Sequence, residues 1–286
     1  MKLMRPHSVD EAAAVMAAAA QPIAYAGGIE VLLGLRSGAL EADVLVDTKR
    51  IEGSAAIETA GTMIRIGPAA RHHDVASDPL VADRLPLLAR ACSQLGTVRI
   101  RMQGTLGGNL AAGLSHTDPG AAVLVYGGRI TLVDSSGRRR VPLAEFWNGT
   151  GTVVRMPGEL IESIELEPLD ADWLVTHERV ESRHRPPSAV LSCAMRIVDG
   201  HIAQCRLAAG AVGDRPRRLG RIEAVLSGCR SAEIGAVVAE HRALIGEEAC
   251  ARSNRAGSAG HKTDLLAGLI QRAVVRLAAE ARKVPA

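Results

Sequence analysis

The sequence predicts an α+β protein in two parts: a mixed helix–strand region up to about residue 170, then an antiparallel sheet with helices. Helix and strand signals alternate through the first fifty residues. Two long apolar runs, Ala189–Val198 and His201–Ala209, are joined by Asp199-Gly200, a strong hairpin signal. Segments with helical periodicity follow at about 220–228, 232–240 and 264–282. With 286 residues, 47% of them apolar, the chain is long enough for two cores.

The first fifty residues predict a small β-α-β-like unit. Ser8 and Glu11 have the spacing of a capping box, which opens an alanine-rich helix to about residue 20. Pro22 ends that helix and begins a short buried strand, after which Gly27–Gly28 forces a tight turn. A helix or loop over 31–40 then leads to a second strand, Val44–Asp47.

The remainder of the first part predicts hairpins and short helices. The expected elements are a hairpin at 57–67, helices within 69–95 broken at Pro79 and Pro86, a glycine-rich loop at 104–109, an apolar helix at 121–126, a hairpin at 130–142 and a strand at 160–166. An acidic segment around Pro168 then marks a boundary near residue 170.

Composition excludes several classes of function. The net charge of +3 and the 2% share of aromatic residues argue against a nucleic-acid partner. No apolar run is long enough to cross a membrane, and the first 30 residues do not have the pattern of a signal peptide, so we expect a cytoplasmic protein. The five cysteines form no C-x-x-C pair, and the adjacent His72 and His73 do not share a face, so we expect no metal or iron–sulfur site in this chain.

Two glycine-rich segments, Ala26–Glu30 and Thr105–Asn109, are the candidate binding elements. Glycine permits positive φ and removes the Cβ that blocks a ligand, so successive N–H groups can converge on an anion. Two such nests can hold a diphosphate from both sides, with the Thr105 hydroxyl as a further donor. A pair of ordinary tight turns is the alternative. Neither segment has the spacing of a Rossmann or Walker motif.

The segment Gln94–Leu110, which contains Gly-Thr-Leu-Gly-Gly-Asn-Leu, resembles the second flavin loop of the molybdenum hydroxylase flavoproteins. This family includes the medium subunits of carbon monoxide dehydrogenase-like enzymes and the FAD domain of xanthine dehydrogenase. Ala26–Val31 is similar to the family's first loop. Supporting similarity covers nearly the whole chain, through Ser115–Asp118, Pro157–Ile161, Val190–Arg196, Ala209–Val212 and the C-terminal helix.

The resemblance implies a p-cresol methylhydroxylase-type FAD-binding domain of two α/β lobes, about 1–53 and 54–170. A C-terminal flavoprotein domain of antiparallel sheet plus helices, 171–286, would follow. FAD would lie between the lobes, with its diphosphate held by both glycine segments. The implied cofactor-binding residues are Ala26, Gly27, Gly28, Ile29, Glu30, Val31, Leu95, Thr105, Leu106, Gly107, Gly108, Asn109, Asp118, Ile161 and Arg179.

Four of these positions have individual roles in the family pattern. Asp118 would hydrogen-bond the adenosine end of FAD, and it can also serve as a helix N-cap before Pro119. Leu95 would pack on the cofactor, and Ile161 would offer backbone groups near the ring system. Arg179 falls where a lysine often reaches the flavin; its alternative is a solvated charge.

The first loop departs from the family pattern at Ile29, which replaces the usual Thr or Ser. The lost hydroxyl removes one hydrogen bond to phosphate, at a cost of about 1.5–3 kcal/mol, roughly ten- to a hundredfold in affinity. Met102 and Pro187 also depart from the pattern, replacing an asparagine and a frequent aspartate.

The function implied is an electron-transfer flavoprotein subunit without a catalytic side chain of its own. A large subunit would carry the molybdenum cofactor, and a small iron–sulfur subunit would pass electrons through two [2Fe–2S] clusters to FAD in this chain. Reduced FAD would then serve an external electron acceptor. The family's assembly is a dimer of such heterotrimers, a heterohexamer. The alternatives are a self-sufficient flavin oxidoreductase of the same superfold and a flavin-free scaffold subunit.

Overall fold

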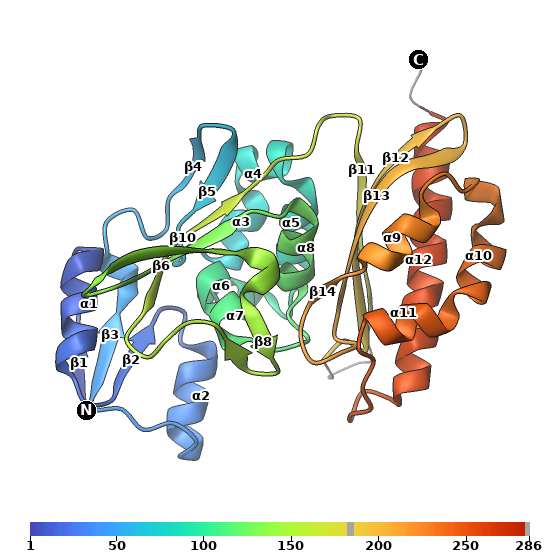
Figure 1. Ribbon diagram of the computed structural model, residues 1–286. Helices are drawn as coiled ribbons and strands as arrows, with labels where there is room; N and C mark the ends of the chain where they lie inside the picture. Colours follow the sequence, from blue (N-terminus) through green and yellow to red (C-terminus); the bar gives the residue numbers. More distant parts are fainter. Residues whose placement is uncertain (182–185, 284–286) are drawn as a thin grey trace. The chain divides into compact units, whose positions relative to one another are not determined.

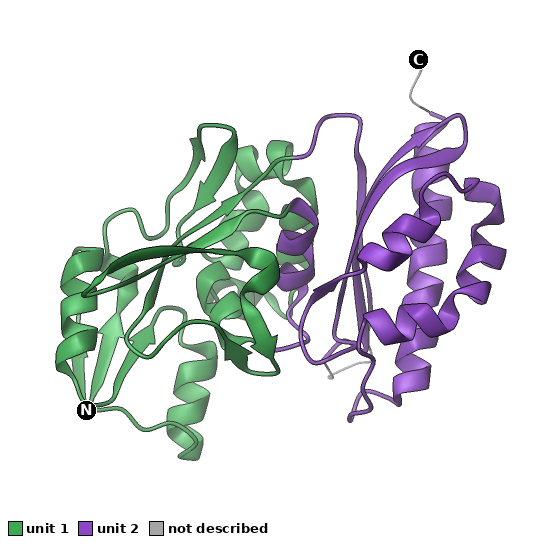
Figure 2. Cartoon of the chain, viewed as in Figure 1, with its two compact units in different colours: residues 1–113, 127–168 green, residues 114–126, 169–286 purple. Residues whose placement is uncertain are grey.

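The computed structural model describes residues 1–181 and 186–283, and it divides into two compact units (Figure 2). Unit 1 comprises residues 1–113 and 127–168, and unit 2 comprises residues 114–126 and 169–286. Helix α8 (Asp118–Tyr126) therefore lies in the sequence between the two segments of unit 1 but packs with unit 2.

Unit 1 begins with a three-stranded parallel sheet in the order β1-β3-β2 (Figure 1). Its elements are β1 (Lys2–Met4), α1 (Val9–Ala18), β2 (Pro22–Tyr25), α2 (Ile29–Ser37) and β3 (Val44–Asp47). The Ser8 hydroxyl accepts the Glu11 N–H at 3.1 Å, so the predicted helix start is confirmed. The Glu11 carboxylate accepts the N–H of His7, not that of Ser8 as in a complete capping box. Strand β1 was not predicted because three residues are too few to show a period.

A five-stranded antiparallel sheet forms the second half of unit 1, in the order β4-β5-β10-β6-β7. Its strands are β4 (Ile57–Ala60), β5 (Met63–Ile66), β6 (Arg129–Asp134), β7 (Gly137–Pro142) and β10 (Leu160–Leu166); β8 (Trp147–Gly149) and β9 (Thr152–Val153) pair separately. Both predicted hairpins are confirmed. A cross-strand row of alternating charge, Glu58, Arg65, Glu165 and Arg129, links four strands through ion pairs.

The helices of unit 1 are α3 (His72–Ser77), α4 (Pro79–Arg84), α5 (Pro86–Gln94), α6 (Val98–Gln103) and α7 (Leu106–Ala112). Pro79 and Pro86 each occupy the first position of a helix, where a missing N–H costs nothing, so the predicted breaks are confirmed. The expectation of a glycine-rich loop at 104–109 was wrong. Thr105 caps a helix there, and residues 106–109 form its first turn.

Unit 2 is a four-stranded antiparallel sheet covered by helices, with strand order β11-β12-β13-β14. Its elements are β11 (Leu174–Val180), β12 (Ala189–Val198), β13 (His201–Gly210), β14 (Arg217–Arg218), α9 (Gly220–Leu226), α10 (Ile234–Glu240), α11 (Arg242–Glu248) and α12 (Ala259–Ala281). Asp199 and Gly200 both have positive φ, so the predicted tight hairpin is confirmed. The apolar stripe of α12 is buried against the side chains of β12, also as predicted.

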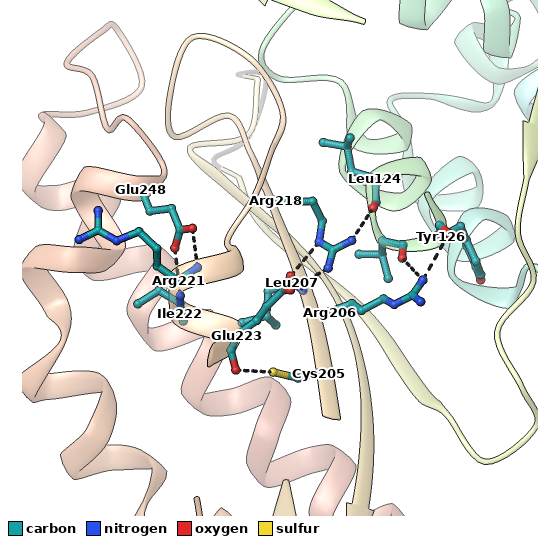
Figure 3. A network of polar contacts seen from close by, with 11 residues as sticks. Leu124, Tyr126, Cys205, Arg206, Leu207, Arg218, Arg221, Ile222, Glu223 and Glu248 are labelled. Carbon is teal, nitrogen blue, oxygen red and sulfur yellow. Dashed lines mark hydrogen bonds and ion pairs between the residues drawn. The ribbon is translucent and has the colours of Figure 1, made fainter. Parts of the chain in front are cut away.

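Helix α8 is buried along its whole length within unit 2. Two arginines bind its last carbonyl groups (Figure 3): Arg206 donates to Val125 and Tyr126, and Arg218 donates to Leu124 at 3.2 Å. Glu223 holds Arg218 with two hydrogen bonds of 2.7 Å. These cations give hydrogen-bond partners to carbonyls that a buried helix end leaves without partners. They also interact favourably with the partial negative charge of the helix dipole at this end.

Replacing Arg218 by Met removes the bond to α8 and leaves the half-buried Glu223 carboxylate without its charged partner, with only the Leu207 N–H, among the described residues, still donating to it. We expect the free energy of unfolding to fall by roughly 1.5–3 kcal/mol, measured by urea denaturation. The matched control is Arg221→Met, which breaks only an exposed ion pair with Glu247 and should cost less than about 1 kcal/mol. Equal losses in the two variants would contradict the role given to Arg218.

Candidate functional site

The two predicted glycine segments lie against each other in unit 1. A Cβ on Gly27 would fall 2.2 Å from the carbonyl oxygen of Gln103 and 2.9 Å from the Cα of Gly104. Only a glycine permits this backbone-to-backbone contact. Gly28 follows with φ of +76° and starts α2, so the predicted tight turn is a strand-to-helix junction. We call residues 26–31 the first junction and residues 104–109 the second junction.

The second junction uses its backbone donors inside the protein. The N–H groups of Leu106 and Gly107 donate to Ala70 and Pro68 at 2.9 Å, and those of Gly108 and Asn109 donate to Thr105. Gly107 is packed so closely on Pro68 that a Cβ would lie 2.5 Å from it. The second junction is therefore a braced helix start, which differs from the open nest expected from the sequence.

The first junction keeps its backbone donors available. The first bond of α2 runs from the Leu32 N–H to the Gly28 carbonyl. Within the described ranges, 1–181 and 186–283, the N–H groups of residues 27–31 have no protein acceptor. Helix starts with free N–H groups attract anions, because the helix dipole adds a partial positive charge. The anion-binding capacity of the paired junctions lies mainly on this side.

His72 packs against the second junction at Gly104. Its N–H donates to the Gly104 carbonyl at 3.0 Å, and its imidazole Cδ2 would lie 3.1 Å from a Cβ on Gly104. The Cys92 sulfur lies 3.7 Å from Nδ1 of the same ring. Burial lowers the pKa of His72 to about 4, so the ring is neutral near pH 7. In the sequence His72 stands out only through its neighbour His73, and that pattern does not predict this supporting position.

Lys49 is a second residue that sequence analysis missed. Its ammonium donates to the Ala26 carbonyl at 3.1 Å, at the start of the first junction. Lys49 follows β3, which runs parallel to β2, so both strands end at the same edge of the sheet. That topology was the available signal, because ligands bind at the carboxyl ends of parallel strands.

Leu95 and Ile161 occupy separate positions in unit 1. Leu95 is half-buried at the end of α5, and its carbonyl accepts a hydrogen bond from Arg101. Ile161, on β10, lines a cavity of about 890 Å³ together with Thr48 and Pro68. Pro68 also contacts Gly107 of the second junction, and Thr48 donates to the carbonyl of Tyr25, one residue before the first junction. The volume is within the range of small-molecule sites, roughly 300–1,000 Å³.

Asp118 and Arg179 form an ion pair inside unit 2, with Asp118 Oδ2 2.8 Å from Arg179 Nη1. Burial raises the pKa of Asp118 to about 7, against the opposing effect of the Arg179 charge. Asp118 Oδ1 is buried and has no hydrogen-bond partner among the described residues. Arg179, which also pairs with Glu181, is only 12% exposed and is not a solvated charge.

This pair corrects one expectation, the helix cap, and involves two others that concern FAD. Asp118 is the first residue of α8, and its carboxylate binds Arg179, so it is not an N-cap. The family resemblance implied that Asp118 contacts the adenosine end of FAD and that Arg179 reaches the flavin end. In the structure the two side chains are in direct contact, and both roles stay predictions.

The segment before Asp118 is tied to the Ala209–Val212 motif. The Ala211 N–H donates to the Ser115 carbonyl, and the fully buried Lys262 donates to the Ala211 carbonyl at 2.9 Å. Ala211 has a positive φ of 63°. Two segments that carried the family resemblance are thus adjacent in unit 2, and a buried cation fixes the contact between them.

The contact of two glycine junctions, one with free amides at a helix start, suits a protein that binds a dinucleotide. Residues 1–168 match the family model of the FAD binding domain in molybdopterin dehydrogenase, and residues 179–277 match that of the CO dehydrogenase flavoprotein C-terminal domain. The chain belongs to this family of FAD-binding domains of molybdopterin dehydrogenases, as the resemblance implied. It is an FAD-binding medium subunit of the molybdenum hydroxylase type.

Curated relatives are similar in sequence to this chain over most of its length. The nicotine 6-hydroxylase medium subunit of Paenarthrobacter nicotinovorans is 25% identical over 96% of both chains, and the carbon monoxide dehydrogenase medium chain of Hydrogenophaga pseudoflava is 27% identical over 94% of both. The structure of carbon monoxide dehydrogenase from Hydrogenophaga pseudoflava matches with a TM-score of 0.90 and 25% identity over 98% of both chains. Quinoline 2-oxidoreductase from Pseudomonas putida 86 shares the fold, with a TM-score of 0.89 and 22% identity over 98% of both chains.

Two absences concern the described residues alone. None of their helices is long and apolar enough to cross a membrane. The same residues contain no group of three or more His, Cys, Asp or Glu side chains placed to hold a metal ion.

Replacing Gly27 by Ala forces the two junctions apart, because the new Cβ would meet backbone that cannot move away cheaply. We expect a loss of roughly 1–3 kcal/mol in unfolding free energy and at least a tenfold weaker FAD affinity by fluorescence titration. In the control, Gly38→Ala, the added Cβ points into open space at a φ of +74°. It should lose about 1–2 kcal/mol to backbone strain and keep its FAD affinity. Unchanged FAD binding in Gly27→Ala would contradict the importance of the contact.

The lowered pKa of His72 predicts a pH-dependent stability. Between pH 6.5 and 4 the unfolded chain protonates this ring and the folded chain does not, so stability is complete above 6.5 and falls on acidification. The contribution is at most roughly 3 kcal/mol. Comparing unfolding free energies at pH 7 and pH 4.5, His72→Gln should show a smaller loss than the wild type. The exposed neighbour in His73→Gln should leave the loss unchanged; a parallel effect in both variants would refute the assignment.

Proposed function

We propose that this chain is the electron-transfer flavoprotein subunit of a molybdenum-containing hydroxylase or dehydrogenase complex. Electrons from [2Fe–2S] clusters on a small partner subunit would reach FAD in this chain and leave to an external acceptor. A large partner subunit would carry the molybdenum cofactor and the substrate site. The carrying observation is the contact of the two junctions, with free N–H groups on one of them, in a chain whose family binds FAD.

The residues present fit FAD. Free amides at the first junction suit a diphosphate. The Oδ1 atoms of Asn109 and Asp118 are buried and have no hydrogen-bond partner among the residues that the structure describes, so they suit donors from a ligand. FAD supplies electron transfer singly or in pairs when bound. The proposed cofactor-binding residues remain Ala26, Gly27, Gly28, Ile29, Glu30, Val31, Leu95, Thr105, Leu106, Gly107, Gly108, Asn109, Asp118, Ile161 and Arg179.

Within this set we assign Asp118 and Arg179 to one end of the cofactor. Arg179 holds one carboxylate oxygen of Asp118, which leaves Oδ1 free to accept a hydroxyl or N–H donor. The protein thus presents a fixed acceptor and keeps the charge of the carboxylate balanced. Leu95 would pack on the cofactor, and Ile161 would offer backbone groups near the ring system.

We further propose the functional division at about residue 170, with lobes 1–53 and 54–170 and a C-terminal domain 171–286. The complex would be cytoplasmic and would contain two copies of each of three subunits. None of the five cysteines, all within the described residues, forms a disulfide, which suits a reducing compartment. The names of several relatives, medium chain or medium subunit, support a multi-subunit assembly.

The proposal predicts a yellow protein that releases one FAD per chain on denaturation. When the small cysteine-rich subunit is reduced and mixed with this chain, the flavin absorbance should bleach; without that subunit it should not. Co-purification with a molybdenum-containing chain should accompany it. A folded, colourless chain that takes up no added FAD would refute the proposal, and turnover of a small substrate by this chain alone would favour a self-sufficient oxidoreductase.

A further inference from the structure

We propose that Lys49 is a ligand of the FAD diphosphate and supplies the positive charge that the first junction lacks. The inference rests on the proposed function, because it takes the diphosphate to lie at the paired junctions. It concerns a residue outside both glycine motifs, delivered by a different strand.

Lys49 is held at the first junction by three neighbours. Its Nζ lies 3.1 Å from the Ala26 carbonyl oxygen, 2.7 Å from Asp47 Oδ1 and 3.9 Å from the centroid of the Tyr25 ring. That ring contacts Gly28 so closely that a Cβ there would lie 2.6 Å from Tyr25 Cε2. The ammonium therefore sits beside the turn itself, fixed by a carbonyl, a carboxylate and an aromatic face.

The position of Lys49 follows from the sheet. Tyr25 and Asp47 are partners in the parallel pairing of β2 and β3, so the residues after them emerge side by side. Asp47 also accepts the Lys49 N–H at 3.1 Å and starts the short 3-10 turn Thr48–Arg50. This turn directs the lysine back over β2 toward Ala26.

One donor of the ammonium is left for a ligand. An ammonium has three N–H donors, and two are used by Ala26 and Asp47. The Lys49 side chain is 40% exposed, so a ligand at the junction can reach it. The nearby Asp47 carboxylate balances part of the charge, so we expect a moderate contribution to affinity.

The first junction needs such a group for two reasons. Backbone amides carry only partial charges, whereas a diphosphate is an anion that pairs best with a full positive charge. Ile29 supplies no hydroxyl, and the amides of the second junction are bonded internally. Across residues 1–181 and 186–283, no other Lys or Arg side chain bonds to the first junction.

The test compares FAD dissociation constants of the full-length chain by flavin fluorescence at low and high salt. Lys49→Met keeps the apolar stem and should bind FAD about tenfold more weakly, with a flatter salt dependence. Lys49→Arg keeps the charge and should stay within about threefold of wild type. Arg50→Met removes an adjacent exposed charge and should match wild type. Thermal unfolding of the FAD-free variants shows whether each is folded.

A double variant, Asp47→Asn/Lys49→Met, separates contact from charge balance. If Lys49 touches the diphosphate, the double variant stays weak, because the contact is still missing. If Lys49 merely neutralises Asp47, removing both charges restores affinity, and the proposal is overturned. It is also overturned if Lys49→Met binds FAD within twofold of a wild type that binds FAD. A wild type that takes up no FAD would instead refute the proposed function.

Discussion

The close approach of Gly27 to the Gln103–Gly104 peptide is the constraint on which the site depends. It brings together two segments separated by more than seventy residues, and it leaves no room for a side chain. The surrounding structure fixes the second junction. The carbonyls of Pro68 and Ala70 accept hydrogen bonds from the first amides of α7, and the neutral His72 ring packs against Gly104. The first junction, by contrast, has backbone amides without a protein acceptor among the described residues. One junction is therefore a brace, and the other is the binding surface that we propose for the diphosphate.

Unit 2 places its charges at the two ends of a buried helix. Asp118 stands at the start of α8 with Arg179, and Arg206 and Arg218 bind its last carbonyls. This distribution complements the helix dipole, with an acid at the amino end and cations at the carboxyl end. A wholly buried helix requires such partners, because no water reaches its terminal groups. The Asp118 carboxylate at the amino end, which among the described residues binds Arg179 and no terminal N–H group, also presents the free acceptor that we assign to the cofactor.

Sequence analysis predicted most of the fold, because the signals it used are local. The Ser8 cap, the Pro79 and Pro86 helix starts and the Asp199-Gly200 hairpin each depend on a few neighbouring residues. It failed where distant contacts decide the outcome. Residues 106–109 contain two glycines and suggest a loop, yet Thr105 and contacts with Pro68 and Ala70 make them a helix start.

The same division explains what the sequence revealed of the site. Both glycine segments were identifiable by composition, but the pairing of Asp118 with Arg179 and the position of Lys49 depend on chain segments brought together by folding. Ile29 shows the consequence. Within its motif, Ile29 replaces a Thr or Ser, and the missing hydroxyl predicts weaker FAD binding. At the edge of the parallel sheet, however, Lys49 from the turn after β3 binds the carbonyl of Ala26 at the start of the same junction, so the phosphate ligand that we propose would compensate for the donor missing at Ile29.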